Sequence, residues 1–541
     1  MDVRAAGPSF PHWIAQHAVA TPERIFAQDA AGGELTYAQT QAAGDRWARA
    51  AAAVDVQAGT HVAVMIPTSL TFIECLLGLA RVRAVPVPVN TDFKGRMFVH
   101  VLQNSQAELM LVSARYLTRL SDIAAQLTHL RRVVVIPDPG VDDDFAKAGV
   151  IVETLDAFLA RGGDQTLPAD MPKPSDVAGI IYTSGTTGAS KGVMVPWGQL
   201  EASVTTLFPA GTPTPDDVYY VPLPLFHLSG WYGVLAMAMA GGRVVVRERF
   251  KTDAFWADVA RFGCTTTLIL GAMKEWLVAG VDDWPATTTL RNALIIPLGS
   301  TGRMFTDRLG VRVCTMFGMT ETGHPIVSGA WNPTEAAGCG RVRDGYEVRV
   351  VDDDDQEVPD GTAGELLIRT TEPWRLNLGY WAMPEATLAT WRNLWFHSGD
   401  YLRRSPDGSF FFVDRKKDAI RRRGENISSA EVEAEVMAHP GVLECAAIPV
   451  PSEFGEDEVM VYLARRPGET FSEADLIAFL EPRMPRFMVP RFIAIIPELP
   501  KTETEKIRKS ALREQGLTPE TWDREPGGRR SSDEHVAVAH D

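Results

Sequence analysis

The chain has 541 residues, a net charge of −16, 45% hydrophobic residues and 23% charged residues. This length is more than a single hydrophobic core usually organises, so we expect two or more domains. The acidic balance disfavours nonspecific binding to nucleic acid or to an anionic membrane surface. The sequence has no apolar stretch long enough to predict a membrane span, and its first residues do not resemble a cleaved leader.

The cysteines are spread along the chain, and none lies in a C-x-x-C pair or beside a histidine cluster. They are Cys75, Cys264, Cys314, Cys339 and Cys445. This pattern predicts neither a disulfide framework nor a zinc site. Reduced thiols are typical of a cytoplasmic protein, which is the location that we expect.

Helix-like and strand-like segments alternate between Leu35 and about Thr320. Helices are expected at Tyr37–Val54 and Ser69–Arg83. Strands are expected at His61–Met65, Val85–Val89, Leu109–Val112, Arg132–Ile136, Gly179–Tyr182, Val244–Val246, Thr267–Ile269 and Ala293–Pro297. An alternation of this kind predicts an α/β fold in which helices cover a mainly parallel sheet.

Beyond about Gly340 the pattern changes to short strands joined by turns. Strands are expected at Tyr346–Val351, Gly364–Arg369 and Phe410–Val413. The aspartate run Asp352–Asp355 falls in one of the turns. A solvated hairpin tip is favoured there over a cation site, because charge runs in turns usually face solvent.

A second change occurs near Asp414, where the basic stretch Arg415–Arg423 leads toward a helix that starts behind Ser428 and Ser429. The alternating strands and helices that follow are enough for one small domain. The segment from Trp522 to Asp541 is polar and predicts a disordered tail. The expected division is therefore residues 1–415, residues 416–521 and a tail at residues 522–541.

The segment Ile180–Val193 gives the strongest functional signal, because an apolar strand runs into hydroxyl residues, glycines and a lysine. Glycines let backbone N–H groups turn toward an anion, while hydroxyls add donors and a lysine adds positive charge. The candidate phosphate-binding residues are Thr183, Ser184, Gly185, Thr186, Thr187, Gly188 and Lys191. We interpret this segment as a polyphosphate site.

Two other motifs compete for the same loop. A Walker-type loop needs glycine before its lysine and a hydroxyl residue after it, whereas Ser190 and Gly192 occupy those positions. Gly188–Gly192 does fit G-x-S-x-G, the nucleophile elbow of serine hydrolases, in which a helix follows the serine directly. Because Val193–Pro196 has an extended pattern, a hydrolase acting through Ser190 is the disfavoured alternative.

The loop YTSGTTGASKG resembles the phosphate loop of the adenylating superfamily of acyl-CoA synthetases, adenylation domains and luciferases, known as the ANL superfamily. Further motifs of that family follow in the same order over roughly residues 35 to 510, and they most resemble those of a freestanding acyl-CoA synthetase. The resemblance implies a large N-terminal domain of mainly parallel sheets with helices and a small β-barrel-like subdomain. A small mobile α+β C-terminal domain would follow.

Two motifs carry the implied catalytic groups of the large domain. Leu223–Gly230 resembles the segment that contributes a residue between the acyl and nucleotide pockets, which makes His227 a candidate. Met316–Glu321 resembles the motif beside the nucleotide, so Phe317 would stack on adenine. Thr320 would then bond the α-phosphate, and Glu321 would help to hold Mg²⁺.

The motifs near the C-terminus imply further roles. In His397–Asp400 the aspartate Asp400 would bind the ribose, and Arg415 would reach the same sugar. Lys417 stands where relatives pivot between two domain orientations, and Gly424 lies on the loop that they present for thioester formation. Lys506 resembles the lysine that bridges the acyl carboxylate and the α-phosphate.

The resemblance also implies two adjoining pockets. Nucleotide-side candidates are Gly299, Ser300, Gly318 and Met319, and acyl-side candidates are His227, Trp231, Gly271, Leu298, Gly299, Gly318 and His324. The Phe226–His227 site lacks the aspartate that many amino-acid adenylation domains use, which disfavours an amino-acid substrate. The chain departs from the family pattern at Ser190, at Glu505 beside Lys506, and at Ile295–Ser300.

The reaction implied by the resemblance is ATP-dependent activation of a carboxylic acid to an acyl-AMP with release of pyrophosphate, followed by transfer to coenzyme A. The expected small-molecule partners are the acid, ATP with Mg²⁺, and coenzyme A, without nucleic acid. Loading of a separate carrier protein and a noncatalytic binder of the same fold are the open alternatives. Pairing of two copies as a homodimer is also left open.

Overall fold

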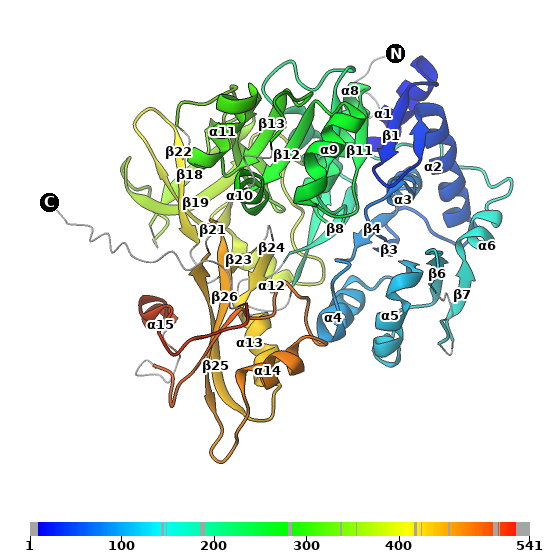
Figure 1. The fold of residues 1–541 in the computed structure, drawn as a ribbon. Helices are drawn as coiled ribbons and strands as arrows, with labels where there is room; N and C mark the ends of the chain where they lie inside the picture. Colours follow the sequence, from blue (N-terminus) through cyan, green and yellow to red (C-terminus); the bar gives the residue numbers. More distant parts are fainter. Residues whose placement is uncertain are drawn as a thin grey trace.

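The computed structural model describes residues 9–141, 145–147, 149–183, 190–279, 284–335, 338–352, 354–415, 419–422, 425–452, 455–500, 507 and 509–525. A large body formed by the N-terminal four-fifths of the chain holds a smaller C-terminal part against one side (Figure 1). The fold is α/β, as the alternating sequence pattern predicts.

One sheet of the large body has seven strands, and all its pairings are parallel except that of β1 with β2. Its spatial order is β14 (Arg312–Cys314), β13 (Asn292–Ile296), β12 (Thr266–Leu270), β10 (Val218–Val221), β11 (Arg243–Val246), β1 (Ile25–Asp29) and β2 (Glu34–Thr36). The helices of this region are α1 (Phe10–Ala20), α8 (Leu228–Ala240), α9 (Thr252–Phe262), α10 (Gly271–Ala279) and α11 (Gly299–Leu309). Helix α8 is apolar on nearly all sides and is buried accordingly.

A second sheet is entirely parallel and has the order β4 (Val85–Pro88), β3 (His61–Met65), β5 (Leu109–Ser113), β6 (Arg132–Ile136) and β7 (Ile151–Thr154). Its helices are α2 (Tyr37–Ala52), α3 (Leu70–Arg81), α4 (Gly95–Ser105), α5 (Leu117–Ile123) and α6 (Leu155–Ala160). Helices α2 and α3 meet closely at Gly78, where an added Cβ would lie 2.3 Å from the Cβ of Trp47. The expected strands in this region are confirmed to within one residue.

The predicted phosphate loop joins two antiparallel strands, β8 (Val177–Thr183) and β9 (Lys191–Pro196), and helix α7 (Trp197–Thr205) follows β9. The strand β8 is thus confirmed, although it pairs with β9 and not within either parallel sheet. The extended conformation expected for Val193–Pro196 is also confirmed. A strand after Ser190 does not fit a nucleophile elbow, which needs a helix there.

Antiparallel strands form the rest of the large body. One group is β15 (Met316–Met319), β16 (Gly323–Val327) and β17 (Arg341–Val342); the other is β18 (Tyr346–Val351), β19 (Ala363–Thr370), β21 (Trp395–Arg404), β20 (Trp391–Arg392) and β22 (Phe410–Arg415), with helix α12 (Pro384–Thr390). In the turn after β18, a carboxylate oxygen of Asp352 accepts the backbone N–H groups of Asp354 and Gln356. That geometry is typical of a local hairpin tip.

The C-terminal part begins with a hairpin, β23 (Ala419–Arg422) and β24 (Glu425–Ser428). A four-stranded sheet follows, formed by β25 (Val442–Pro451), β26 (Asp457–Arg465), β27 (Phe492–Ile495) and β28 (Trp522–Asp523), with helices α13 (Ser429–Met437), α14 (Glu473–Leu480) and α15 (Lys509–Gln515). The strand β28 corrects the expected start of the tail at Trp522. Trp522 packs against the core of this part, and Asp523 accepts from the guanidinium of Arg491.

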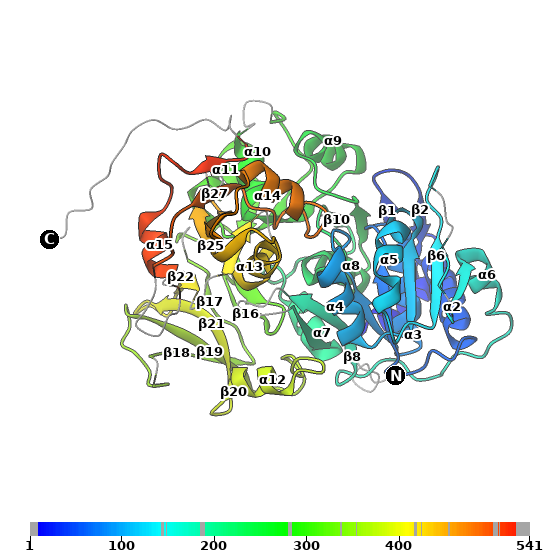
Figure 2. The ribbon, with the colours of Figure 1, turned by 90° about the horizontal axis from the view of Figure 1, so that it is seen from below.

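The C-terminal part docks against the start of α4 in the large body (Figure 2). The ammonium of Lys94 donates to the backbone carbonyl of Glu481 over 3.3 Å, and Arg96 lies 3.8 Å from the carboxylate of Glu435. Met97 completes the hydrophobic core of the C-terminal part. The two parts are therefore in direct contact in this arrangement.

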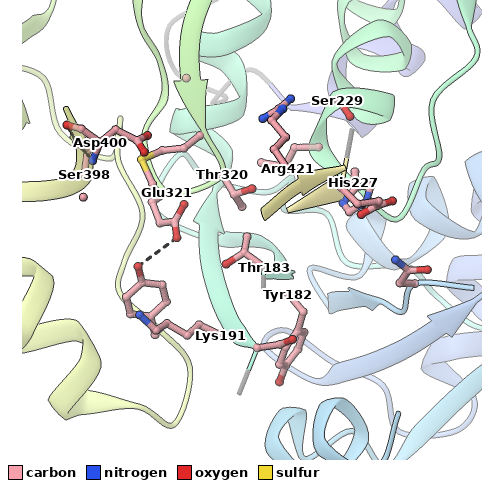
Figure 3. Close-up of a pocket in the computed structure, with 18 of the residues that line it drawn as sticks. Tyr182, Thr183, Lys191, His227, Ser229, Thr320, Glu321, Ser398, Asp400 and Arg421 are labelled. Atoms are coloured by element: carbon pink, nitrogen blue, oxygen red, sulfur yellow. Dashed lines mark hydrogen bonds and ion pairs between the residues drawn. The ribbon is translucent and has the colours of Figure 1, made fainter. Parts of the chain in front are cut away.

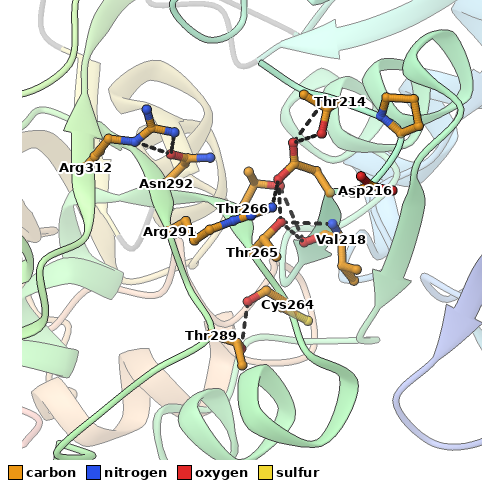
Figure 4. Close-up of polar contacts among 12 residues, drawn as sticks. Thr214, Asp216, Val218, Cys264, Thr265, Thr266, Thr289, Arg291, Asn292 and Arg312 are labelled. Atoms are coloured by element: carbon orange, nitrogen blue, oxygen red, sulfur yellow. Dashed lines mark hydrogen bonds and ion pairs between the residues drawn. The ribbon is translucent and has the colours of Figure 1, made fainter. Parts of the chain in front are cut away.

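A polar network joins the N-terminal ends of β10, β12 and β13 in the seven-stranded sheet (Figure 4). The carboxylate of Asp217 accepts from the backbone and hydroxyl of Thr214 at 2.8 and 2.9 Å, from the hydroxyl of Thr265 at 2.7 Å, and from Arg291 at 2.8 Å. These bonds lower the pKa of Asp217 although burial acts to raise it. In the described part of the chain, every helix is too short or too polar to cross a membrane.

Candidate functional site

A cavity of about 810 Å³ lies where the large body meets the C-terminal part. It opens at the carboxyl ends of β10, β12 and β13, which is the edge at which α/β sheets commonly bind ligands. Of the residues predicted from the sequence, those that line it are Thr183, Lys191, His227, Gly318, Met319, Thr320, Glu321, His324 and Asp400. Figure 3 labels six of them, which converge from separate elements: Thr183, Lys191, His227, Thr320, Glu321 and Asp400.

The phosphate side of the cavity is built on the β8–β9 hairpin. Thr183 ends β8 and faces Lys191, the first residue of β9, across the ladder. The ammonium of Lys191 lies 4.8 Å from the centre of the Tyr380 ring, a cation–π distance. The predicted loop residues Ser184, Gly185, Thr186, Thr187 and Gly188 lie outside the described residues.

Thr320 and Glu321 form the turn between β15 and β16. The side-chain amide of Gln199 donates to the carbonyl of Thr320 over 2.7 Å, and the hydroxyl of Tyr380 donates to the carboxylate of Glu321 over 3.1 Å. Glu321 is almost fully buried, yet it lines the cavity. The turn therefore presents a hydroxyl and a carboxylate opposite the phosphate hairpin.

Phe317 is not one of the residues that line this cavity. Its ring is buried among Ile326, Tyr346 and neighbouring barrel residues, and it stacks on Phe412 with ring centres 6.4 Å apart. The next residue, Gly318, does line the cavity, where a Cβ would lie 2.3 Å from the carbonyl oxygen of Gly323. Stacking of Phe317 on adenine stays a prediction.

The predicted ribose side lies on β21. Asp400 lines the cavity and pairs in register with Arg415 of β22, whose side chain is outside the described set. The turn before Asp400 is held by Glu365, which accepts from the backbone N–H of Gly399 over 3.1 Å, and by Ser398, which accepts from the backbone N–H of Asp400. Glu365 and Ser398 also line the cavity and were not predicted.

The end of the cavity beside His324, a predicted acyl-side residue, is mainly apolar. It is formed by Leu268 and Leu270 of β12, Ile296 of β13, and Leu228 and Tyr232 of α8. His324 closes it and packs edge-on against Tyr232, with ring centres 4.5 Å apart. Burial, and to a smaller extent the charge of Arg343, lower the pKa of His324 to about 3. His324 is therefore uncharged at neutral pH.

Several residues predicted for the pockets do not line the cavity. Trp231 is fully buried beneath it and donates from its indole to the carbonyl of Leu225. Leu298 belongs to the hydrophobic core. Gly271, Gly299 and Ser300 start helices behind the lining residues, and the buried ammonium of Lys274 donates there to the carbonyls of Pro297 and Leu298 at 3.3 and 3.2 Å.

The C-terminal part supplies a wall of the cavity that the sequence did not predict. Arg421, Glu425, Glu431, Phe487 and Met488 line it from that side. The carboxylate of Glu425 lies 2.9 Å from Nε2 of His227, the residue predicted to stand between the two pockets. Burial acts to lower the pKa of His227, but the charge of Glu425 outweighs it and leaves the pKa raised.

A second contact joins the C-terminal part to the phosphate hairpin. The hydroxyl of Ser190 donates to a carboxylate oxygen of Glu431 over 2.9 Å, and the carbonyl of Ser190 lies 2.8 Å from Nε2 of His100. Enclosure raises the pKa of Glu431 to about 7, although the bonds from Ser190 act to lower it. Ser190 is thus a docking residue, which argues against its use as a hydrolase nucleophile.

The basic residues Arg421–Arg423 of the predicted basic stretch do not share one environment. Arg421 lines the cavity, and Arg423 lies outside the described residues. Arg422 is fully buried, where its guanidinium donates to the carbonyls of Phe487 and Val489 and pairs with Glu458. Arg422 therefore braces the Phe487–Met488 segment of the cavity wall.

Four predicted positions cannot be located. Lys417, Gly424, Lys506 and the neighbouring Glu505 lie outside the described residues. The described residues that flank Gly424 do reach the cavity, because Arg421 and Glu425 stand on the two strands of its hairpin. The proximity expected for this loop is consistent with the positions of those neighbours.

The amino-acid sequence matches two family models, AMP-binding enzyme over residues 14–381 and AMP-binding enzyme C-terminal domain over residues 431–506. The chain therefore belongs to the AMP-binding enzyme family. The two matches fall on either side of the expected division at residue 415.

Among curated relatives, a crotonobetaine/carnitine–CoA ligase of Salmonella paratyphi A is 30% identical over 492 residues, covering 89% of this chain and 93% of the relative. Among solved structures, a double mutant of o-succinylbenzoate CoA synthetase from Bacillus subtilis bound with its product analogue OSB-NCoA has a TM-score of 0.79 at 22% identity, covering 94% of this chain and 99% of that one. The same synthetase in complex with AMP has a TM-score of 0.64 at 21% identity, covering 93% and 98%. These structures share the fold of this chain.

Proposed function

We propose that the protein is an AMP-forming ligase that joins a carboxylic acid to coenzyme A through an acyl-AMP. One observation carries this proposal. A single cavity combines Lys191 and Thr183 from the phosphate hairpin, the Thr320–Glu321 turn and Asp400 with an apolar end closed by His324. Such a cavity suits a nucleotide and an uncharged acyl group side by side, which is what adenylation of an acid needs.

In the first half-reaction the acid carboxylate attacks the α-phosphorus of ATP, and pyrophosphate leaves. Charge builds on phosphate oxygens, so the protein mainly positions and neutralises. Lys191 and the loop Thr183–Gly188 would bind the polyphosphate, Thr320 the α-phosphate, and Asp400 and Arg415 the ribose. Lys506 would bridge the carboxylate and the α-phosphate.

Mg²⁺ fits the residues present. Among the described residues no cluster of three or more His, Cys, Asp or Glu side chains forms a metal cage. Mg²⁺ is usually held by one or two carboxylates together with substrate phosphates, and Glu321 offers one carboxylate beside the phosphate side. Bound there, the ion would neutralise phosphate charge.

In the second half-reaction the thiol of coenzyme A attacks the acyl-AMP and AMP leaves. The arrangement of this structure supports a role in that step, because the hairpin that carries Gly424 packs against His227 through Glu425. The higher TM-score with the synthetase bound to a product analogue than with its AMP complex points the same way. Lys417 would be the pivot by which residues 416–521 turn against residues 1–415.

The acyl group is proposed to be uncharged. The described residues at the acyl end of the cavity are Leu228, Tyr232, Leu268, Leu270, Ile296 and the neutral His324. A second carboxylate or a quaternary ammonium would lose its hydration against these side chains. The charged lining residues Arg421 and Glu425 belong to the wall that the C-terminal part supplies. The substrate would thus differ from carnitine, on which the curated relatives act according to their name.

Three broader assignments accompany this function. We place the enzyme in the cytoplasm, where ATP and coenzyme A are available. A carrier protein is the second acceptor to be tested, because the same acyl-AMP could pass to a carrier thiol. Sedimentation of the purified protein would decide whether two copies form a homodimer.

Acid-dependent exchange of labelled pyrophosphate into ATP tests the proposal. Matched acids of similar size, such as hexanoate, adipate and carnitine, separate uncharged from charged acyl groups. We expect exchange with acids whose acyl chain carries no further charge, such as hexanoate. On addition of coenzyme A, the same acids should yield AMP and acyl-CoA. Folded protein without exchange across a broad panel would contradict the proposal, as would ester hydrolysis without ATP that is lost in Ser190→Ala.

Lys506→Ala separates the two half-reactions. If Lys506 bridges the carboxylate and the α-phosphate, this variant should lose about 100-fold or more of its exchange activity and still convert supplied acyl-AMP and coenzyme A into the thioester. An equal loss in both half-reactions would refute the assigned role.

A further inference from the structure

A short segment, Asn377–Trp381, spans the two sides of the phosphate site. On one side it pairs with β9, the strand that begins at Lys191. The backbone N–H of Leu378 donates to the carbonyl of Met194 over 2.9 Å, that of Met194 donates to Gly379 over 3.0 Å, and that of Trp381 donates to Gly192 over 2.8 Å. The segment is therefore an added strand-like edge of the phosphate hairpin.

On its other side the same segment forms hydrogen bonds with the backbone of Glu321. The backbone N–H and side-chain amide of Asn377 both donate to the backbone carbonyl of Glu321, over 3.0 and 2.8 Å. The side-chain oxygen of Asn377 accepts from the N–H of Gly379 over 2.8 Å, which fixes the amide orientation. The segment thus ties the metal-side turn to the strand that carries the phosphate-side lysine.

Tyr380 lies in the middle of this segment and touches both functional side chains. Its ring lies beneath the ammonium of Lys191, and its hydroxyl donates to Glu321, as the dashed line in Figure 3 marks. The residue is 5% exposed, and its backbone N–H donates to the hydroxyl of Thr387 over 2.9 Å. Because its ring is buried and its backbone is hydrogen-bonded, Tyr380 can hold the longer side chains of Lys191 and Glu321 in fixed positions.

Each contact has a physical consequence for the site. An aromatic face stabilises an ammonium group without cancelling its charge, so Lys191 stays available to an anion. A hydroxyl donor on a carboxylate oxygen fixes the orientation of the Glu321 side chain at the edge of the cavity.

We propose that Tyr380 is a positioning residue of the adenylation half-reaction, which aligns Lys191 through its ring and Glu321 through its hydroxyl so that both meet the phosphates of Mg·ATP. This inference rests on the proposed function but adds a residue to it. Tyr380 touches the side chains and not the reacting atoms. Its effect should therefore fall on metal and nucleotide binding and not on thiol attack.

The test compares Tyr380→Phe, which keeps the ring and removes the hydroxyl, with Tyr380→Leu, which removes both. The Mg²⁺ concentration for half-maximal pyrophosphate exchange and the calorimetric affinity for ATP with and without Mg²⁺ are measured for each. We expect Tyr380→Phe to raise the Mg²⁺ requirement about 5-fold to 10-fold and to keep metal-free ATP affinity. Tyr380→Leu should also weaken metal-free ATP binding by roughly 3-fold.

Tyr220→Phe is the matched control, because its buried hydroxyl donates to the carboxylate of Asp258 over 2.7 Å in the core and away from the cavity. It should lower the thermal midpoint without changing the Mg²⁺ requirement. Thioester formation from supplied acyl-AMP and coenzyme A should be unchanged in Tyr380→Phe. This arm shows whether a loss is confined to adenylation.

Two outcomes would overturn the inference. One is an unchanged Mg²⁺ requirement in Tyr380→Phe. The other is that Tyr380→Phe lowers the rates of both half-reactions equally and lowers the thermal midpoint as much as Tyr220→Phe does, which would indicate a purely structural role. If Tyr380→Leu does not fold, Tyr380→Phe alone decides. A wild-type protein that binds Mg·ATP but shows no acid-dependent exchange would refute the proposed function, while the calorimetric arm would still test Tyr380.

Discussion

Two enclosed carboxylates, Asp217 of the large body and Glu431 of the C-terminal part, behave differently. Asp217 receives four bonds from Thr214, Thr265 and Arg291, and its pKa is lowered. Glu431 receives its bonds from Ser190, and enclosure raises its pKa to about 7. Asp217 and its partners all belong to the large body, whereas Glu431 and Ser190 belong to different parts of the chain.

This difference separates a structural carboxylate from one linked to domain arrangement. The partners of Asp217 are fixed by the fold, so its charge is stabilised whenever the large body is folded. The partner of Glu431 is present only while the C-terminal part is docked as here. Enclosing a charged carboxylate costs free energy, and enclosure raises the pKa of Glu431. The docked arrangement should therefore be sensitive to the protonation of Glu431.

The largest effect is expected for Asp217→Ala. This change leaves several donors and Arg291 without their shared acceptor and should lower the free energy of unfolding by about 3 kcal/mol. Because the pKa of Asp217 is lowered, the contribution is complete above its ordinary value of 3.8 and is lost as the pH falls below it. Chemical denaturation at pH 7 and pH 3 measures this difference.

Activity provides the control for Asp217→Ala. Folded variant at low temperature should retain pyrophosphate exchange, because Asp217 is remote from the cavity. A denaturation midpoint equal to that of the wild type would show that this network is not a structural anchor.

Glu431→Gln tests the pH dependence of docking. A carboxyl whose pKa rises from 4.5 to about 7 on docking takes up a proton, so docking weakens as the pH rises from about 4.5 to 7 and stays weak above that. The measured quantity is the wild-type rate of thioester formation from supplied acyl-AMP, divided by the rate of the Glu431→Gln variant at the same pH. This ratio should fall about 10-fold as the pH rises through this window. Dividing by the variant removes the ionisation of the thiol, and a ratio that does not change with pH would contradict the linkage.

Ser190→Ala should slow thioester formation by a smaller factor than the change expected for Glu431, and it should affect pyrophosphate exchange even less. Removal of the hydroxyl takes away the hydrogen bond that Ser190 donates to the Glu431 carboxyl in the docked arrangement. We expect this loss to slow thioester formation about 5-fold. Pyrophosphate exchange should change by less than about 2-fold, because the hydroxyl is engaged only when the parts are docked. Single-turnover rates of each half-reaction measure the split; a selective loss of exchange would place Ser190 at the nucleotide instead.

The smallest effect is expected for Glu425→Gln. The charge of Glu425 raises the pKa of His227, so their attraction is complete below the ordinary His pKa of 6.5 and is lost as the pH rises through the raised value. Both side chains are partly exposed, so thioester formation below pH 6.5 should slow only about 2-fold to 3-fold. A difference from the wild type that grows with rising pH would have the wrong sign for this pair.

Much of the fold and part of the site follow from local sequence. Strands such as His61–Met65 are contiguous apolar runs, and the glycine- and hydroxyl-rich loop marks the phosphate side through Lys191. Thr320 and Glu321 stand in a turn directly after β15, and Asp400 stands on β21, so motif position and cavity position coincide.

The remaining site residues depend on information that local sequence does not contain. Whether a ring such as Phe317 faces the cavity or the barrel is decided by the packing of both sides of β15. Arg422 belongs to a charged run but is buried, because carbonyls of a distant segment meet its guanidinium. Glu425 and Glu431 enter the site only through docking of the C-terminal part, which no single motif specifies.

The most direct test of the central claim is a product balance with purified protein, ATP, Mg²⁺, an uncharged acid and coenzyme A. Mass spectrometry quantifies AMP, pyrophosphate and acyl-CoA over the time course. If one cavity activates the acid and passes it to coenzyme A, the three products should appear in equal amounts. Formation of ADP and phosphate in place of AMP and pyrophosphate, or acyl-CoA that forms without ATP, would contradict it.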